Sequence, residues 1–341
     1  MSKISFKPKQ ISNRLLSILP KRARDILEKR FGLKDGNTMT LEAIGKIYGI
    51  TRERVRQIEN FAINTIKKSE IYKKERPVFE ELEKLLYSLG GVVSEEDLLS
   101  YISNDKNTRN HILFFLVLGD SFKKQKEDNH FKHRWIIDEE ESKKVHESLK
   151  KLYESLSDED IIPEGEMITR FLENLKDISE KYKNEEIAKR WLSVSKKIDK
   201  NSLGEWGIAE SPNIKVRGMR DYAFLVIRKH GNPMHFSEVA KVIEKSFNKK
   251  AHVATCHNEL IKDPRFVLVG RGLYALKEWG YASGVVRDVI REILQKAGPL
   301  TRQEIIDKVL KERYVKPNTI VVNLQNPKYF KKDKNSRYAA I

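Results

Sequence analysis

Cysteine is nearly absent from this sequence, because Cys256 is the only one among 341 residues. A single thiol excludes an internal disulfide framework and any zinc site built from several cysteines. Long apolar runs are missing too, since the longest, Ile112 to Gly119, is far shorter than the roughly 18–20 residues of a membrane-spanning helix. The N-terminus lacks the apolar stretch of a secretory signal. We therefore expect a cytoplasmic protein that has no membrane partner.

Signatures of catalysis and cofactor binding are also missing. The chain has no P-loop, no nucleophile elbow and no HExxH motif. The acidic runs at 139–141 and 157–160 suit helix caps and solvated linkers better than paired catalytic carboxylates. His252 and His257 flank Cys256, but a fourth ligand for a metal is absent. The sequence thus predicts no catalytic residue, no metal and no cofactor.

Positive charge, in contrast, is abundant and unevenly distributed. The chain has 66 Lys and Arg against 49 Asp and Glu, a net charge of +17. Residues 1–76 carry 19 cations against 8 anions, and residues 211–341 carry 26 against 12, whereas residues 139–186 carry 8 against 15. Basic surface of this density attracts a polyanion, most often nucleic acid. A solvated, lysine-rich surface is the alternative, and charge alone does not separate the two.

The first basic block has the spacing of short helices joined by tight turns. Apolar residues at helical intervals predict helices over 11–18 and 21–31. Thr40 begins another helix, with Ile47 among the residues on its inner face, and Gly49 ends it. A further helix starts directly after this glycine turn. Two helices joined by a short turn that contains glycine form a helix-turn-helix pattern.

The helix that Thr51 caps carries the most specific signal in the chain. Its apolar positions face the core and leave four polar side chains outside: Arg52, Glu53, Arg56 and Gln57. The N-terminal residues of such a helix face base edges in the major groove, where Arg pairs with guanine, Gln with adenine and Glu with cytosine. A carboxylate among arginines disfavours simple phosphate binding, so we expect these four residues to read bases. Arg54 and Lys46 are placed to meet phosphates.

Three blocks, at 22–33, 40–50 and 51–59, resemble region 4 of the sigma-70 family, the part of bacterial initiation factors that reads the −35 promoter element. The resemblance implies that the four outward residues contact −35 bases. It also implies a set of residues near the DNA backbone: Arg22, Arg30, Thr40 and Arg54. The family uses this domain to hold the flap of the β subunit of RNA polymerase, and we expect that contact near Leu15 to Ile26.

The sequence departs from the sigma-factor pattern at its N-terminus. Sigma factors read and melt the −10 element with an aromatic-rich region 2 that precedes region 4, and here only about ten residues precede the match. Without regions 2 and 3, the chain is not expected to act as a complete initiation factor.

After Pro77 the pattern becomes a recurring order of three helices and a hairpin, which is the outline of a winged helix. The second round of this order is looser, and its third expected helix covers 184–200. The matched turns at Pro233 and Pro299 indicate that the last two units are an internal duplication. We expect a mainly α fold in which a helix-turn-helix domain precedes tandem winged-helix (α+β) units. The expected domains are 1–76, 77–140, 141–212, 213–281 and 282–341.

Residues 217–280 resemble a HARE-type winged helix, through their apolar helix faces, the Asn232-Pro233 turn and a hairpin of glycine and aromatic residues. This module also occurs in the delta subunit of some bacterial RNA polymerases, in chromatin-associated proteins and near restriction enzymes. Four residues of the last two hairpins are candidate wing contacts to DNA, with a solvated hairpin as an equal alternative: Arg271, Lys277, Lys331 and Lys332.

These observations predict a bacterial transcription regulator that binds double-stranded DNA at −35-like promoter elements, contacts RNA polymerase and associates with the nucleoid. The alternative is an RNA polymerase-binding adaptor with generic DNA affinity. A nuclease of a defence system is a third hypothesis, which no catalytic constellation supports. The sequence does not indicate activation or repression, the target genes, the oligomeric state, or the role of residues 77–210.

Overall fold

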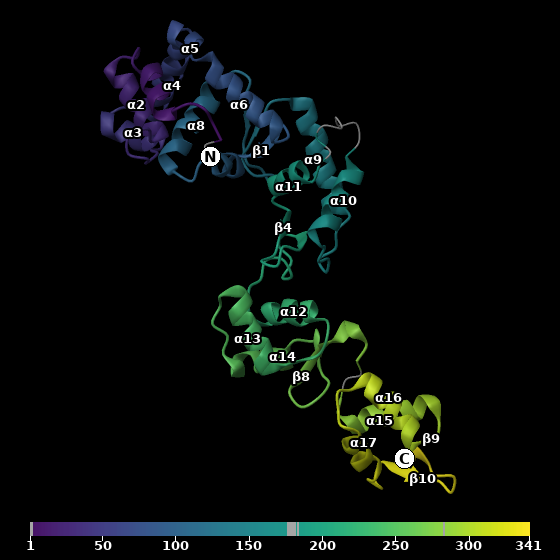
Figure 1. Cartoon of the computed structure of the whole chain (residues 1–341). Coiled ribbons are helices and arrows are strands. Elements are labelled where there is room, and N and C mark those ends of the chain that lie inside the picture. Colours follow the sequence, from purple (N-terminus) through teal and green to yellow (C-terminus); the bar gives the residue numbers. More distant parts are fainter. Residues whose placement is uncertain (1–2, 176–181, 183, 282–283) are drawn as a thin grey trace. The chain divides into compact units, whose positions relative to one another are not determined.

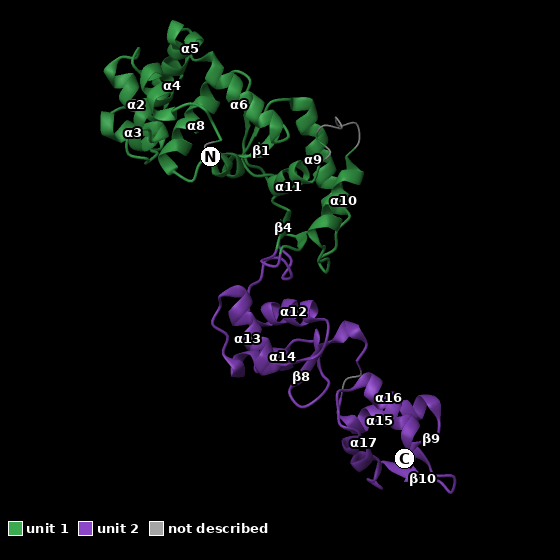
Figure 2. Cartoon of the chain, in the orientation of Figure 1, with its two compact units in different colours: residues 1–200, 204–209 green, residues 201–203, 210–341 purple. Residues whose placement is uncertain are grey.

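The computed structural model describes residues 3–175, 182, 184–281 and 284–341. The fold is mainly helical, with small antiparallel sheets between the helices, as the sequence predicts (Figure 1). The chain divides into two compact units: residues 1–200 with 204–209, and residues 201–203 with 210–341 (Figure 2). The finer division into five domains remains a prediction.

The helices of the first unit are α1 (Pro8–Leu16), α2 (Lys21–Phe31), α3 (Leu41–Tyr48), α4 (Arg52–Lys67), α5 (Glu70–Lys74), α6 (Arg76–Ser88), α7 (Glu95–Ile102), α8 (Lys106–Leu118), α9 (Glu139–Glu154), α10 (Glu164–Asn174) and α11 (Glu185–Val194). Its strands are β1 (Val92–Ser94), β2 (Lys123–Gln125), β3 (Arg134–Ile136), β4 (Ile198–Lys200) and β5 (Trp206–Ile208). They form one antiparallel sheet in the order β1-β3-β2 and one β4-β5 pair.

The second unit repeats one arrangement twice. Its first half contains α12 (Met219–His230), β6 (Met234–His235), α13 (Phe236–Phe247), α14 (Val253–Lys262), β7 (Phe266–Leu268), β8 (Leu273–Leu276) and the short 3₁₀ helix Lys277–Trp279. Its second half contains α15 (Val286–Ala297), β9 (Leu300–Thr301), α16 (Arg302–Glu312), α17 (Pro317–Leu324), β10 (Phe330–Lys332) and β11 (Arg337–Ala340). In each half, a short strand and a hairpin form a three-stranded sheet, β6-β8-β7 and β10-β11-β9.

Many of the helices begin where a side chain can cap the first turn. Ser94 accepts a hydrogen bond from the backbone N–H of Asp97 at 3.2 Å, and Asp105 accepts one from Thr108 at 2.8 Å. Each cap satisfies a backbone donor that would otherwise lack a partner at the start of a helix. For this reason local sequence predicts where α7 and α8 begin.

The core of the first unit extends beyond the helix-turn-helix region into the segment that follows it. Leu15 and Leu27 share one buried cluster with Leu82 and Phe115. Helix α8 packs against α1 and α2. The buried amide of Asn110 donates to the backbone carbonyls of Gly32 and Gly36, both at 3.1 Å. The chain from residue 4 to residue 135 is therefore built around a common core.

The β2–β3 hairpin is likewise attached to the segment after it. Phe131 forms an antiparallel bridge with Ser195. The backbone N–H of Lys132 donates to the carbonyl of Val194 at 3.0 Å, and that of Lys196 donates to the carbonyl of His130 at 2.7 Å. The β2–β3 hairpin therefore joins the segment that follows α8 to the end of α11 within the first unit.

Two elements differ from the sequence prediction. A helix is expected over 11–18, but α1 covers Pro8–Leu16, with Pro8 in its first turn, where proline is tolerated. The spacing predicts a single helix over 184–200, but α11 ends at Val194 and β4 starts at Ile198. Ser195 makes the break, because its hydroxyl accepts hydrogen bonds from the backbone N–H groups of Lys197 and Ile198 at 3.0 and 3.1 Å. A serine that bonds the backbone in this way competes with helix continuation.

Candidate nucleic-acid interface

Helices α3 and α4 form the helix-turn-helix. The Thr40 hydroxyl caps α3 by accepting from the N–H of Ala43 at 3.1 Å, and the Thr51 hydroxyl caps α4 by accepting from the N–H of Arg54 at 3.2 Å. Gly49 ends α3 at a φ of +61°, which favours glycine. A Cβ at Gly45 would lie 2.6 Å from the carbonyl oxygen of Ile50, so the turn packs too closely for a side chain there.

The two helices are held together by a small apolar core. Ile44 of α3 and Val55 of α4 are fully buried against Ile26 of α2. Ala62 and Ile66 extend the buried face of α4. The side of α4 that carries Val55, Ala62 and Ile66 packs in the core, and the opposite side is exposed.

All four residues predicted to read bases lie exposed on the first two turns of α4. Two of them are paired: Arg56 donates to Glu53 through Nε at 2.8 Å and through Nη2 at 2.6 Å. These hydrogen bonds lower the pKa of Glu53 and raise that of Arg56. Arg54 Nη1 donates to Gln57 Oε1 at 3.0 Å. These pairs bring charged and neutral donors and acceptors close together on the exposed side of α4.

The same face continues past the residues that the sequence singles out. Phe61 lies one turn beyond Gln57 and is 60% exposed. Asn60 and Asn64 are exposed beside it. Sequence reasoning missed Phe61, although its spacing of four from Gln57 on a helix was a signal, because aromatic residues are usually assigned to the core.

The predicted DNA-backbone residues fall into two groups. Arg22 and Lys46 are exposed, the first over the ring of Tyr48 at 5.3 Å and the second 3.3 Å from Glu42 in an ion pair between helical neighbours. Exposed pairs of this kind exchange partners easily, because water competes with each contact. Both side chains are free to reach a phosphate.

Arg30 and Thr40 are more strongly engaged. Arg30 lies 3.5 Å from the carboxylate of Glu59 and donates to the carbonyl of Met39 at 3.1 Å. Burial raises the pKa of Glu59, and the Arg30 charge opposes part of that effect. Arg30 therefore braces α2 against α4, while the hydroxyl of Thr40 serves as a helix cap. Their role at DNA remains a prediction.

One expectation for this domain needs correction. Ile47 is expected on the inner face of α3 but is 54% exposed, because Ile44 is the residue of α3 that packs in the core with Ile26 and Val55. The contact of Leu15 to Ile26 with the polymerase flap stays a prediction, and within this segment Leu15, Leu16 and Ile26 are fully buried. A partner at this segment would have to bind its exposed polar residues.

The four candidate wing residues lie in different settings. Arg271 is exposed at the turn between β7 and β8. Lys277 is exposed after the end of β8, away from that turn. Lys331 and Lys332 are exposed on β10, close to the turn that leads into β11.

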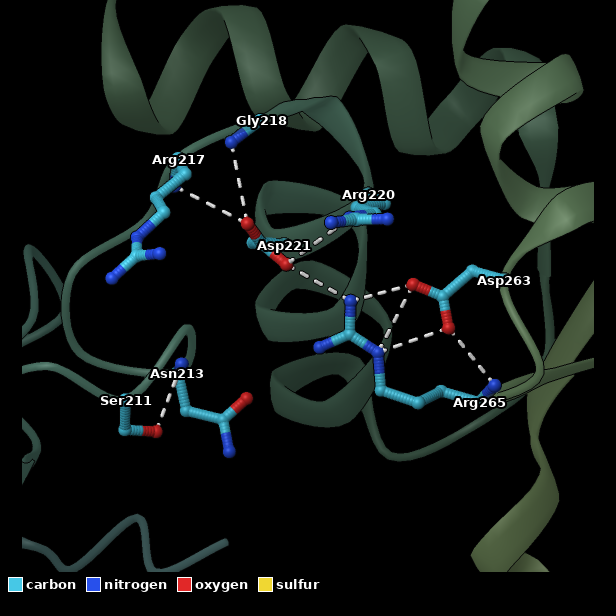
Figure 3. A network of polar contacts seen from close by, with 8 residues as sticks. All are labelled: Ser211, Asn213, Arg217, Gly218, Arg220, Asp221, Asp263 and Arg265. Carbon is cyan, nitrogen blue, oxygen red and sulfur yellow. Dashed lines mark hydrogen bonds and ion pairs between the residues drawn. The ribbon is translucent and has the colours of Figure 1, made fainter. Parts of the chain in front are cut away.

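A second dense group of charges lies in the second unit (Figure 3). Arg265 Nη2 donates to Asp221 at 2.9 Å and to Asp263 at 2.6 Å. Asp221 also accepts from the backbone N–H groups of Arg217 and Gly218, both at 3.2 Å. Burial alone would raise the pKa of Asp263, but hydrogen bonds from Arg265 outweigh it and hold that pKa below its usual range. The group joins the start of α12 to the start of β7, so its role is structural.

The described residues also bear on metal binding, membrane insertion and thiol chemistry. No group of three or more His, Cys, Asp or Glu there could hold a metal ion. In the same part of the chain, no helix is long and apolar enough to cross a bilayer. Cys256 is buried, and burial raises the pKa of its thiol to about 11. That pKa keeps the thiol protonated and unreactive near neutral pH.

Comparisons with known proteins bear on two parts of the chain. Residues 15–68 match the model of the family described as Sigma-70, region 4. Residues 217–279 match the model of the HARE-HTH family, a helix-turn-helix domain whose description names ASXL and restriction endonuclease. Both resemblances seen in the sequence are confirmed, and both families are helix-turn-helix domains, not families of enzymes.

A curated relative matches in a limited region. Over 53 residues, the chain is 49% identical to the RNA polymerase sigma factor SigA of Bacillus sp. The aligned stretch is 16% of this chain and 14% of the sigma factor. These matches support a DNA-binding, transcription-related function.

Proposed function

We propose that this chain is a transcription regulator that binds double-stranded promoter DNA, with α4 in the major groove of a −35-like element. The observation that carries the proposal is the face of α4, where four side chains suited to base edges are exposed together. Helix capping at Thr51 holds the first turn of α4 in place. A helix-turn-helix presents this turn to the bases.

The surrounding charges suit the DNA backbone. Arg22, Lys46 and Arg54 are exposed cations on α2, α3 and α4, respectively. Contacts to phosphates orient a protein on the duplex without reading sequence. RNA polymerase is proposed as a second partner, by analogy with the sigma factor that matches this domain.

The test is fluorescence anisotropy of the full chain on a duplex bearing TTGACA and on a scrambled duplex, across a salt series. The variant combines Arg52→Ala, Glu53→Ala and Gln57→Ala. Loss of a bidentate base contact costs about 1–3 kcal/mol, so the preference for TTGACA should fall by about fivefold or more. The matched control is Glu166→Ala with Arg170→Ala, another exposed Glu–Arg pair on a helix, whose atoms are 2.6 Å apart.

Unchanged preference in the triple variant would refute base reading by α4. Loss of preference in the control would show a general effect of charge. If the unaltered chain binds both duplexes equally and releases both as salt rises, phosphate contacts dominate.

An adaptor that binds RNA polymerase and has generic DNA affinity is the second candidate. The exposed apolar side chains of Ile47 on α3 and Phe61 on α4 favour it, because large exposed apolar side chains suit a protein partner. Retention of the full chain on immobilised core polymerase, lost in the variant Ile47→Asp with Phe61→Asp, would support it. No retention of the unaltered chain would remove it.

A further inference from the structure

The second unit contains a cavity of about 550 Å³ where its two halves meet. Three segments line it: the β7–β8 turn, the start of α15 and the loop from α16 to α17. The N–H of Tyr314 donates to the carbonyl of Val269 at 3.1 Å, and Arg313 donates to the carbonyls of Leu268 and Gly284. These hydrogen bonds join the three segments, so the wall of the cavity is held in place.

Arg313 brings a buried positive charge to this cavity. The residue is only 4% exposed, and its two terminal nitrogens are the ones that donate to backbone carbonyls. Among the described residues, none accepts a hydrogen bond from its Nε, and no carboxylate lies within ion-pair distance of its guanidinium group.

Burial lowers the pKa of Arg313, and the more distant charges of Asp288 and Glu312 oppose part of that effect. A buried charge that lacks a countercharge is costly. An anion bound in the cavity would supply the missing countercharge and would use the Nε donor.

The other charged residues of the lining have the same sign. Arg271 and Lys316 are exposed at the cavity, and none of its lining residues in the described structure is Asp or Glu. Lys316 also precedes α17, which starts without a side-chain cap and contributes Thr319 to the lining. Backbone N–H groups at the start of a helix favour a negative charge. The polar part of the cavity therefore suits an anion.

The rest of the lining is largely apolar. Leu268, Val285 and Tyr314 are large side chains that line the cavity and remain exposed. A cavity of this size, with an apolar lining and a few polar groups that fix orientation, is typical of sites for small molecules.

We propose that this cavity binds a small molecule that joins an apolar body to one anionic group, a carboxylate or a phosphate. The anionic group lies beside Arg313 and Lys316. The apolar body lies against the exposed side chains of Leu268, Val285 and Tyr314. Because Arg313 is buried, a small ligand reaches it more readily than the phosphates of a duplex.

Such a ligand touches both halves of the second unit, so its binding stabilises the arrangement in which they meet. The proposal does not rest on DNA binding by α4.

The first experiment titrates the full chain with anilinonaphthalene sulfonate, a fluorescent anion that has an apolar ring body. Phenylnaphthylamine, which has the same kind of ring body and no anionic group, is the uncharged comparison. A hydrogen bond to a charged group changes affinity by about tenfold or more, so the anionic probe should bind more tightly by at least that factor. Octanoate and octyl phosphate should displace it, whereas octanol should not. The stronger of the two anions identifies the anionic group.

The variants test the cavity residues. Arg313→Gln should weaken binding of the anionic probe by about tenfold or more and leave the uncharged probe unaffected. Arg271→Gln with Lys316→Gln removes two exposed charges of the lining and should also weaken the anionic probe. The matched control, Lys241→Gln with Lys308→Gln, removes two exposed charges from α13 and α16 outside the lining and should bind like the unaltered chain.

Hydrogen exchange locates the bound probe. The amide of Tyr314 donates across to the first half of the second unit, so the anionic probe should slow its exchange in the unaltered chain and not in Arg313→Gln. Circular dichroism checks that Arg313→Gln is folded. If it is not, the exposed double variant decides the outcome.

Several results would overturn the proposal. They are equal affinity for the anionic and uncharged probes, equal weakening in the cavity and control variants, and unchanged affinity in the cavity variants. No saturable binding of the anionic probe would have the same meaning. None of these measurements involves DNA, so their failure is distinct from failure of base reading by α4.

Discussion

Individual side chains of α4 combine opposite charges, a combination that the proposed base reading would use and that phosphate binding alone would not. Glu53 and Arg56 are both about half exposed, at 55% and 54%, and they bond each other at 2.6 Å. A surface meant for phosphates alone gains nothing from the carboxylate, which repels them. At a base edge, the same pair offers an acceptor and a fork of donors side by side.

At the same scale, protonation of His146 is expected to destabilise the first unit. Its Nε2 accepts from Arg134 Nε at 2.8 Å, and its ring lies 4.3 Å from that of Phe131. Burial, helped by the charge of Arg134, lowers the pKa of His146 from 6.5 to about 4. Between these pH values the unfolded chain binds a proton that the folded chain does not. The free energy of unfolding therefore falls as pH decreases from 6.5 toward 4.

Thermal unfolding at pH 7.5 and pH 5 measures this effect. The unaltered first unit should melt at a lower temperature at pH 5. His146→Gln should shrink the difference, and a smaller one should persist because the pKa of His111 is also lowered, mainly by burial. An unchanged pH dependence in His146→Gln would contradict the assignment.

At the scale of elements, the cap of α4 links folding to recognition. Thr51→Ala removes the acceptor for the N–H of Arg54, 3.2 Å away, and is expected to lower the free energy of unfolding by about 1 kcal/mol. It should also weaken DNA binding, because the frayed turn carries Arg52 and Glu53. Thr51→Ser keeps an acceptor and should restore both properties.

The control for this prediction is a cap of the same chemistry elsewhere. Thr301 accepts from the N–H of Glu304 at 3.4 Å at the start of α16. Thr301→Ala should destabilise the second unit without changing sequence preference. Chemical denaturation measures the free energy of unfolding, and anisotropy measures the sequence preference. Equal loss of preference in Thr51→Ala and Thr301→Ala would contradict a specific link between the α4 cap and DNA recognition.

At the scale of the whole molecule, the two compact units are expected to unfold separately. Leu82 belongs to the core of the first unit and Ile305 to that of the second, and both are fully buried. Replacing either with alanine removes buried methyl groups and leaves a cavity, at a cost of about 2–5 kcal/mol.

Calorimetry should therefore resolve two transitions. Leu82→Ala should lower the transition of the first unit, and Ile305→Ala that of the second. Hydrogen exchange identifies which residues open in each transition. A single transition that shifts as a whole in both variants would show that the units fold as one.

Local sequence determined much of this protein by itself. The apolar spacing and flanking Pro20 and Gly32 predict α2 with the observed bounds of 21–31. Thr40 and Thr51 mark where α3 and α4 begin. The exposure of the four outward residues of α4 follows from helical periodicity, so the residues now proposed to read DNA were accessible to sequence reasoning. Caps and periodicity act over a few residues, which is why a sequence reveals them.

Only the tertiary structure shows which distant residues pack against the helices and hairpins that local sequence predicts. Asn110 meets Gly32 across 78 positions, and Phe131 bridges to Ser195 across a comparable gap, so no local pattern signals either contact. Packing against α8 buries Leu15, and an ion pair with Glu59 makes Arg30 link α2 to α4. These outcomes depend on which distant surfaces meet, because burial and pairing are properties of neighbours in space, not in sequence.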